Sequence, residues 1–462
     1  MNIVEQANKR FKQILSEQDP ATQMDELTKK MAGYDMTMKG KPFPTFLKPY
    51  LLDINEKPQF EKSTLMIMSA IERVVDAFFT DEKFKRLLEL SGPVADFALI
   101  NPIYPNRQIV TRLDAFYIPE TKDIKYIEFN CDSPSGMGWH DVMVDMFWEL
   151  ESVASLHQEF TLQADKFLDT HAQMLLKKYR QFCENKGQKQ SDEPLLAMVC
   201  ARESTIRTDV EIIVEVLKSK GFRSCYADPR DFDYDGHTLT IKGEEVHLIY
   251  RDAVQEFLDE PYFGHTEAVL NAYKDENICF INPFSSRVGG LKSVLAVMHE
   301  ERFHYLFTDE HLDAIQKNIP WTRLMRDIET VYQDQKVPLI NFVKENKDLL
   351  VLKPSSGYGG IDVVIGPDMD TKEWQEKVDQ AMAPGNNYVV QELVPIPHDD
   401  FPVMNEGVFE GFEPKKVNIN FWAFDGVFGG AFARASTGSI INVHQGGGLV
   451  PVFYVGNQIG KA

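Results

Sequence analysis

The stretch LLVLKPSSGYGGIDVVIG, residues 349–366, decides how this sequence is interpreted. An apolar strand is expected up to Lys353, a loop rich in serine and glycine follows, and a second strand is expected from Ile361. Glycines let a loop bring its backbone N–H groups close to phosphate oxygens, and a lysine supplies a positive charge for them. An ordinary hairpin turn with a solvated lysine is the alternative. The segment has neither the GxxxxGKS/T pattern of a P-loop nor the helix that follows a dinucleotide-binding fingerprint.

A second strand end with polar residues lies downstream, in NYVVQELVP (387–395). The apolar run leads directly into Gln391 and Glu392. An adenine ring requires an apolar slot with polar groups at its edge, and a strand that ends in this way can provide both. A buried strand that merely reaches the surface is the alternative.

Upstream, RLDAFYIPETKDIKYIEFNCDSP (112–134) reads as a β-hairpin that carries charged residues. Arg112 and Asp114 are two residues apart, so they share one face of the first strand. Glu128, Asn130 and Asp132 alternate in the same way, and we expect both sets to meet across the ladder. Carboxylate and amide oxygens are hard ligands that suit Mg²⁺. The alternative is an exposed hairpin with surface salt bridges.

The rest of the chain predicts a mixed α/β or α+β fold with more than one domain. The periodicity indicates helices in the first ninety residues, a long helical stretch from His140 to Cys183, and a hairpin over 239–250. Strand, helix and strand within 195–226 predict a βαβ unit and a parallel sheet. The expected division is a mainly helical region (1–106), a hairpin and helices (107–190), the βαβ domain (191–290) and a strand-rich domain (291–462).

Two arginines near other strand ends are further candidates for ligand binding. Arg202 follows the first strand of the βαβ unit, where ligands of α/β proteins often bind, and Arg207 lies close to it. They suit a substrate carboxylate, although solvated loop arginines are the alternative. Arg434 lies near the end of VFGGAFARAS (427–436), and three glycines follow at 446–448. These glycines suit a mobile loop near a phosphate, or a plain turn.

Composition limits the classes of function that fit. The 462 residues contain 49 Lys and Arg against 70 Asp and Glu, which gives a formal net charge of -21. Such a surface repels nucleic acid and anionic membranes, so we expect neither as a partner. There is no apolar run of about 18 residues, so we expect no membrane span. The five cysteines form no CxxC pair, which favours free thiols and a cytoplasmic protein.

Taken in order, these segments resemble the circularly permuted ATP-grasp family, represented by the glutathionylspermidine synthetase domain. The resemblance covers roughly residues 107–460. The motifs that carry it are R-x-D and E-x-N-x-D-x-P in the hairpin, the strand VHLIYRDAV with Arg251, INPFSSRVGGLKSVLAVM with Lys292, the glycine loop after Lys353, the Gln391-Glu392 pair, and Gly-x-x-x-Arg at Arg434. The carboxylates precede the lysines in the chain, which is the permuted arrangement. The related enzymes often carry a cysteine peptidase domain, and the first hundred residues here contain no cysteine.

The resemblance implies a role for each of these residues. Lys292, Lys353 and the loop glycines would hold ATP, and Mg²⁺ would bridge its phosphates. The implied sets are nucleotide-binding Lys292, Lys353, Gly357, Gly359, Gly360, Gln391, Glu392 and Leu393; metal-binding Asp114, Glu128 and Asn130; catalytic Arg112 and Arg434; and, for the substrate, Arg251 and Arg202.

The implied activity is that of an ATP-dependent carboxylate–amine ligase that works through an acyl phosphate. Its substrates would be a small-molecule or peptide acid and an amine. The sequence leaves the oligomeric state open, with a homo-oligomer as one of the alternatives. A non-catalytic ATP-binding regulator or scaffold, or a small-molecule kinase of the same fold, are the alternatives.

Overall fold

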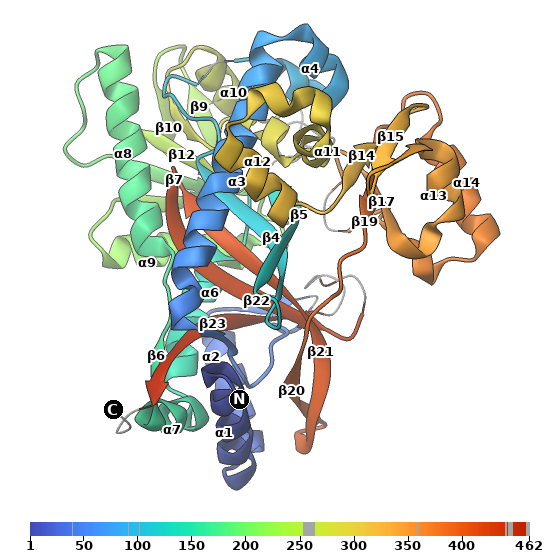
Figure 1. The fold of residues 1–462 in the computed structure, drawn as a ribbon. Coiled ribbons are helices and arrows are strands. Elements are labelled where there is room, and N and C mark those ends of the chain that lie inside the picture. The colour runs from blue at the N-terminus through green and yellow to red at the C-terminus, as the bar shows by residue number, and fades with distance from the viewer. Residues whose placement is uncertain are drawn as a thin grey trace.

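The computed structural model describes residues 1–38, 40–90, 92–100, 102–252, 264–357, 360–438, 441 and 447–458. It confirms the predicted mixed α/β fold, in which the described helices surround several sheets (Figure 1). The helices are α1 Ile3–Glu17, α2 Pro20–Gly33, α3 Lys57–Thr80, α4 Glu82–Leu88, α5 Pro93–Ala98, α6 Met137–Trp148, α7 Glu151–Glu159, α8 Leu168–Lys186, α9 Arg207–Ser219, α10 Glu267–Lys274, α11 Ser293–His299, α12 Asp309–Asn318, α13 Leu339–Glu345 and α14 Thr371–Ala381.

The strands come from every part of the described chain. They are β1 Thr37–Met38, β2 Lys41–Pro42, β3 Tyr50–Asp53, β4 Val110–Ile118, β5 Asp123–Asn130, β6 Phe160–Gln163, β7 Leu196–Val199, β8 Ser224–Ala227, β9 Phe232–Tyr234, β10 Leu239–Ile241, β11 Glu244–Glu245, β12 Leu248–Arg251, β13 Cys279–Ile281, β14 Thr322–Leu324, β15 Glu329–Tyr332, β16 Gln335–Pro338, β17 Leu350–Pro354, β18 Val364–Ile365, β19 Tyr388–Glu392, β20 His398–Asn405, β21 Val408–Phe424, β22 Val427–Ser436 and β23 Gly448–Gln458.

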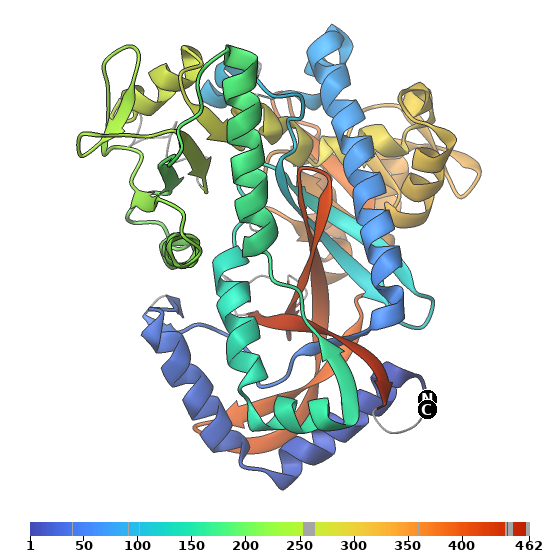
Figure 2. The ribbon, with the colours of Figure 1, turned by 90° about the vertical axis from the view of Figure 1, so that its left-hand side faces the viewer.

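The central sheet joins segments that are far apart in sequence. Its strands follow the order β3-β23-β22-β21-β4-β5, while β20 pairs with β21 and β6 pairs with β23. Helix α3 packs on one face through a stripe of apolar residues that includes Ile67, Ile71 and Val74. Helices α6 and α8 lie on the opposite side, so the sheet is covered on both faces (Figure 2). The predicted hairpin of β4 and β5 is confirmed and pairs with β21 inside this sheet.

A separate parallel sheet follows the order β13-β12-β7-β8. Strand β7, helix α9 and strand β8 form the predicted βαβ unit, with β7 and β8 in parallel register. The predicted hairpin over 239–250 is only partly correct. Strands β10 and β11 form a short hairpin, but β12 leaves it and pairs with β7, because its residues are all buried and belong to the core of the parallel sheet.

The antiparallel sheet β14-β19-β17-β18 builds the lobe on the right of Figure 1. Helices α13 and α14 cover it, and its core contains the fully buried Trp374 with Leu339 and Leu350. The strands expected in 349–354, 361–366 and 387–394 are confirmed, although the second is only two residues long.

The long helical stretch predicted from His140 to Cys183 is only partly correct. Helices α6, α7 and α8 occupy it, and strand β6 interrupts them at Phe160–Gln163. Phe160 and Leu162 are buried in alternation, and β6 pairs with β23 at the edge of the central sheet. Tertiary pairing therefore overrides the helical periodicity of this segment.

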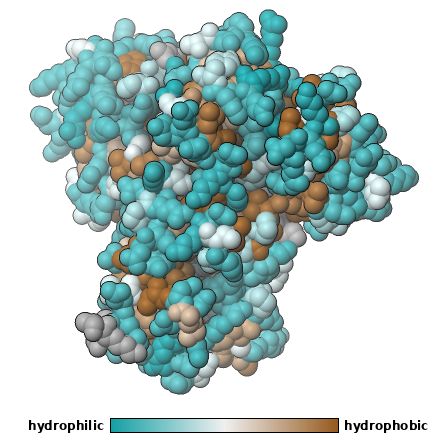
Figure 3. All heavy atoms as spheres, in the orientation of Figure 1, coloured by the Kyte–Doolittle hydropathy of each residue, from teal (hydrophilic) through white to brown (hydrophobic). Residues whose placement is uncertain are grey.

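Two expectations from composition can be compared with the structure. All five cysteines are free thiols, as predicted. Among the described residues, no helix combines the length and apolar character needed to cross a membrane. The face of the molecule in Figure 3 is mostly hydrophilic, and apolar residues gather where the lobe of β17 and β19 meets the central sheet.

Candidate functional site

A cleft separates the β14-β19-β17-β18 lobe from the hairpin β4–β5 and strands β21 and β22. Charged and polar residues from both sides line it: Asp114, Glu128, Lys292, Lys353, Gln391, Glu392, Asn418 and Arg434. The remaining lining is mostly apolar: Phe116, Ile127, Val351, Gly360, Val363, Ile365, Leu393, Val394, Ile396 and Ile441. The structure thus brings most of the predicted residues to one cleft, from segments separated by up to 320 positions.

Lys353 lies near the end of β17 and is buried in the wall of this cleft. Its Nζ donates to Gln391 Oε1 at 2.6 Å and to the Ile127 carbonyl at 3.2 Å. The Gln391 amide in turn donates to Thr322 Oγ1 at 3.0 Å, so the acceptor is held in place. Burial lowers the pKa of Lys353 to about 8, with Glu128 opposing that change and Lys292 adding to it.

Lys292 lies at the N-terminus of α11, beside the glycine loop that follows β17. Its backbone N–H donates to the Ser355 carbonyl at 2.9 Å, and its Nζ donates to the Gly357 carbonyl. The same Nζ lies 2.8 Å from Glu128 Oε1. Gly360 lines the cleft and has a φ of 76°, which favours glycine. Gly359 and the first of the three glycines at 446–448 lie outside the described residues.

The two carboxylates of the hairpin lie directly opposite each other. Asp114 pairs with Glu128 in the β4–β5 ladder, and Arg112 pairs with Asn130. Arg112 Nε lies 2.8 Å from Asp114 Oδ1, and Arg434 Nη1 lies 3.4 Å from Asp114 Oδ2. Burial acts to raise the pKa of Glu128, but the charges of Lys292, Lys353 and Arg112 outweigh it, so the pKa is lowered. Both carboxylates are therefore stabilised by neighbouring cations.

Arg434 completes this group of charges from strand β22. Burial lowers its pKa to about 10, and the nearby Arg112 acts in the same direction, while Asp114 and Glu128 oppose it. The guanidinium is buried and faces the same carboxylates as Arg112. A second buried arginine therefore adds positive charge beside the two hairpin carboxylates.

The donor set fits Mg²⁺ bound in part by the protein. Asp114 and Glu128 supply hard oxygens from opposite positions of the ladder, and the Asn130 side chain has a buried amide nitrogen without a hydrogen-bond partner. No group of three or more His, Cys, Asp or Glu side chains in the described part of the chain is arranged to hold a metal. A cation here would thus need the amide oxygen and ligands from a phosphate or water, which is the usual behaviour of Mg²⁺.

Asp132 was expected on the same face as Glu128 and Asn130, and this expectation is wrong. Strand β5 ends at Asn130, after which Asp132 turns toward the parallel sheet. There it pairs with Arg251 and accepts from Ser286 Oγ at 3.1 Å. The alternation that the sequence suggested ends where the strand ends.

The segment predicted at the edge of an adenine ring lies along the apolar part of the cleft. The Glu392 N–H donates to the Trp321 carbonyl and the Leu393 N–H to the Leu349 carbonyl, both at 2.8 Å. The Glu392 carboxylate accepts from Tyr332 Oη at 2.8 Å. These bonds fix the segment against the neighbouring strands, and Glu392 and Leu393 are among the residues that line the cleft.

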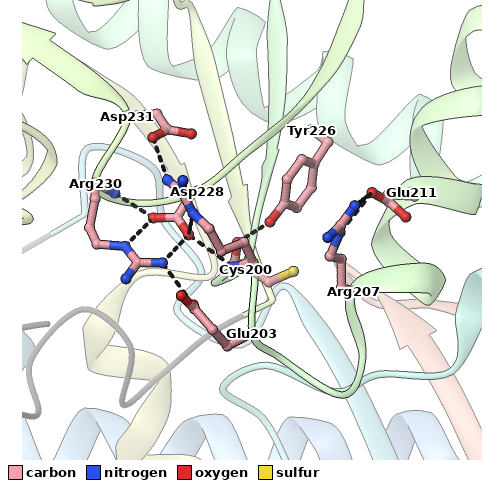
Figure 4. Close-up of polar contacts among 9 residues, drawn as sticks. Cys200, Glu203, Arg207, Glu211, Tyr226, Asp228, Arg230 and Asp231 are labelled. Atoms are coloured by element: carbon pink, nitrogen blue, oxygen red, sulfur yellow. Dashed lines mark hydrogen bonds and ion pairs between the residues drawn. The ribbon is translucent and has the colours of Figure 1, made fainter. Parts of the chain in front are cut away.

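Two predicted substrate residues do not line this cleft. Arg251 is fully buried, stacks over the Phe284 ring at 4.6 Å and is bonded to Asp132. Arg202 lies just beyond the carboxyl end of β7 and pairs with Asp228 and Asp231. Figure 4 shows these two acids with Arg230 and Glu203; we call this group the Asp228 cluster, with the Arg207–Glu211 pair at its edge. There the acidic side chains lie between and beside the arginines, so the positive charge of the cluster is largely balanced.

The sequence interpretation missed Asn418, which lines the cleft from β21. Asn418 pairs with Arg434 across the ladder, and Asn420 pairs with Asp114. Both asparagines are buried. The alternation of two amides within the apolar strand KVNINFWAF was the available signal, because buried amides on one face of a strand need polar partners.

The chain has relatives among known proteins. It is 30% identical over 257 residues to the Frankia casuarinae protein named "Putative glutamate--cysteine ligase 2-2", a match to 52% of this chain and only 28% of that protein. It is 22% identical over 441 residues to an uncharacterized protein of Mycobacterium tuberculosis, covering 90% of this chain and 74% of that one. No protein-family model matches the chain.

A solved structure shares the fold. A glutathione synthetase-like effector from Globodera pallida, solved in its apo form, matches 95% of this chain and 98% of its own, with a TM-score of 0.62 and 13% sequence identity. The chain therefore shares the mixed α/β fold of this glutathione synthetase-like protein.

Proposed function

We propose that this protein is an ATP- and Mg²⁺-dependent ligase of the ATP-grasp type, which joins a carboxylate to an amine through an acyl phosphate. The observation that carries the proposal is the convergence of Lys292, Lys353, Asp114, Glu128 and Arg434 on one cleft with a largely apolar lining. Apolar walls suit a base and converging charges suit its phosphates. The names of two relatives, a glutamate–cysteine ligase and a glutathione synthetase-like effector, point to the same class of reaction.

The proposed chemistry follows from the positions of the charges. A substrate carboxylate oxygen attacks the γ-phosphorus of ATP, ADP leaves, and an acyl phosphate forms. The amine nitrogen then attacks the acyl carbon, the amine loses a proton, and phosphate leaves. Lys292 and Lys353 would hold the phosphates, while Arg112 and Arg434 would stabilise charge on the transferred group. Mg²⁺ held by Asp114, Glu128 and Asn130 would neutralise the phosphate oxygens.

We also propose that the chain has the circularly permuted arrangement of the ATP-grasp fold. The hairpin with Asp114 and Glu128 precedes both lysines in the chain and pairs with β21, which follows them. This order supports the permuted ATP-grasp arrangement and the likeness to the glutathionylspermidine synthetase domain. We further propose a cytoplasmic enzyme that acts on small-molecule or peptide acids and amines. The four-part domain division and a homo-oligomeric state stay predictions.

The test is ATP turnover with Mg²⁺, measured as ADP release against a panel of amino acids, peptides and polyamines, with products identified by mass spectrometry. Lys353→Met is the test variant. Lys372→Ala is the matched control, because this lysine is 88% exposed and lies on α14, in the same lobe. We expect substrate-stimulated ADP release and a condensed product from the wild type and the control, and loss of both in Lys353→Met.

Other outcomes would contradict the proposal in distinct ways. ADP together with a stable phosphorylated product, and no condensation, would indicate a kinase. Binding of ATP without turnover on any substrate of the panel would favour a regulator or scaffold. If the folded wild type does not bind ATP at all, the nucleotide site itself is wrong.

A further inference from the structure

The loop between β5 and α6, residues 131–136, is hydrogen-bonded at both ends to residues of the parallel sheet or of its helix α9. At its start, the Asn282 side chain donates to the Asp132 carbonyl at 2.9 Å, and Asp132 pairs with Arg251. At its end, the first turn of α6 has no capping side chain of its own, since Gly136 occupies the N-cap position. The backbone N–H groups at the N-terminus of a helix need hydrogen-bond acceptors. In α6 these acceptors belong to a residue of another helix, α9.

Asp209 on α9 supplies those acceptors. Its Oδ2 accepts from the Gly136 N–H at 2.6 Å and its Oδ1 accepts from the Trp139 N–H at 2.8 Å. The neighbouring Thr208 accepts from the Trp139 indole at 3.0 Å. Asp209 is fully buried. Burial raises its pKa to about 6, with the donating N–H groups and Arg112 opposing the change, so the carboxylate is ionised at neutral pH.

Helices α6 and α9 pack closely against each other at Gly138. A Cβ on Gly138 would lie 2.4 Å from the Asp209 carbonyl oxygen and 3.2 Å from the Ile212 Cβ. Real Cβ atoms do not approach backbone oxygens so closely. Helices α6 and α9 therefore pack in direct contact at Gly138, and a larger residue there requires one of them to move.

The residue before Gly136 contacts a proposed catalytic arginine. The Ser135 carbonyl accepts from Arg112 Nη1 at 3.0 Å, while Arg112 Nε and Nη2 bind the two Asp114 oxygens at 2.8 and 3.2 Å. Ser135 therefore holds the side of the guanidinium that Asp114 does not hold. Its own place depends on the cap that Asp209 provides at the next residue.

We propose that Asp209 is a positioning residue: by capping α6 it places the Ser135 carbonyl that orients Arg112 toward Asp114. This inference rests on the proposed function, because it assigns Arg112 to phosphoryl transfer. It adds a contribution from the βαβ unit to the chemistry, although that unit does not line the cleft.

Asp141 is a matched control on the same helix. It is also buried, and its two oxygens accept from the backbone N–H groups of Phe167 and Leu168 at 2.7 and 3.0 Å. Burial raises its pKa to about 7, so both residues are buried acids with a raised pKa whose oxygens accept from backbone N–H groups. Unlike Asp209, Asp141 binds the backbone at the start of α8 and makes no hydrogen bond next to Ser135.

The experiment compares Asp209→Asn with Asp141→Asn and the wild type in steady-state kinetics. We expect kcat to fall about 10- to 100-fold in Asp209→Asn, as a displaced catalytic group would cause, with KM for ATP little changed. Asp141→Asn should keep the wild-type kcat. Equal losses in the two variants would overturn the proposal and reduce Asp209 to a structural cap. If Asp209→Asn does not fold, Gly138→Ala displaces α6 from Asp209 and must lower kcat in the same way.

A crystal structure of each variant gives a readout that does not depend on turnover. The bond between Arg112 Nη1 and the Ser135 carbonyl should be broken in Asp209→Asn and intact in Asp141→Asn. An unchanged bond in Asp209→Asn would refute the inference even if the protein proves to be a ligase. Absence of ATP turnover by the wild type would instead refute the proposed function. The crystal structures would still show whether the Arg112–Ser135 bond depends on Asp209.

Discussion

The cleft and the Asp228 cluster both combine basic and acidic side chains at strand ends, yet only the cleft has the character of a ligand site. In the cluster, Asp228 is buried but its partner Arg202 is about half exposed. Each arginine of the cluster also pairs with an acid that is at least partly exposed. In the cleft, Lys353 and Arg434 are buried against apolar walls, where their charges are poorly solvated. Ion pairs form in both places, but those of the cleft are buried and line an open space, whereas those of the cluster are partly solvated.

The largest effect should come from removing a buried charge in the cleft. Lys353→Met should weaken binding of ATP with Mg²⁺ by at least about 100-fold, because charge-assisted hydrogen bonds in a desolvated site are strong. Titration calorimetry would measure the dissociation constant. A similar loss in the exposed control Lys372→Ala would show that the effect is not specific to the cleft.

Replacing a carboxylate of the hairpin should affect the metal more than the nucleotide. Asp114→Asn should raise the Mg²⁺ concentration needed for half-maximal turnover by about 10- to 100-fold, as losses around metal sites usually do. Assays across a range of Mg²⁺ at fixed ATP would measure it. An unchanged Mg²⁺ requirement would remove Asp114 from the metal site.

The pH dependence of ATP binding should report on Lys353. Its pKa of about 8 means that the free protein loses this charge as the pH rises through 8, so affinity should fall by roughly 10-fold between pH 7 and pH 9. Below pH 7 the lysine is fully charged and this contribution is constant. Calorimetry at several pH values would test it, and the same fall in Lys353→Met would assign the effect to another group.

In the cluster, the same kind of change should alter stability and leave ATP binding intact. Asp228→Asn removes the acceptor that Arg202 and Arg230 share, and should cost about 1 to 2 kcal/mol of the free energy of unfolding, a modest value because the guanidinium partners are screened by solvent. The arginines outweigh burial and lower the pKa of Asp228, so this stability is present above pH 4 and is lost as the pH falls further. Denaturant titration would measure both effects.

The smallest effect should come from the outermost pair of the cluster. Arg207 and Glu211 lie one helical turn apart on α9 and are both substantially exposed. Arg207→Ala should change the free energy of unfolding by no more than about 0.5 kcal/mol, the usual value for such pairs. A loss above 2 kcal/mol would mean that the cluster is not the solvated structure described above.

The features of the site that depend on local sequence pattern could be predicted from the sequence. The alternation around Asp114 and Glu128 foretold a shared face of the hairpin, and the ladder has that pairing. The strand end at Lys353 also lies where the pattern indicated. These features follow from the two-residue period of a strand, which does not depend on distant parts of the chain.

What the sequence could not predict depends on partners far along the chain. Strand β6 forms only because β23, almost three hundred residues later, offers an edge to pair with. Asp132 leaves the face of Glu128 because Arg251 binds it, and Asp209 reads as an ordinary acid in the first turn of α9 until α6 is placed against it. The pattern of charged residues in the sequence also does not distinguish the cleft from the Asp228 cluster. The two differ in how deeply their cations are buried, which only the fold determines.

A crystal structure with Mg²⁺ and a non-hydrolysable ATP analogue would show directly whether the cleft is the nucleotide site. We expect the base against the apolar wall near Leu393, the phosphates between Lys292 and Lys353, and the metal bound by Asp114 and Glu128. A nucleotide bound elsewhere, for example at the arginines around Asp228, or a metal that does not contact the hairpin carboxylates, would contradict it.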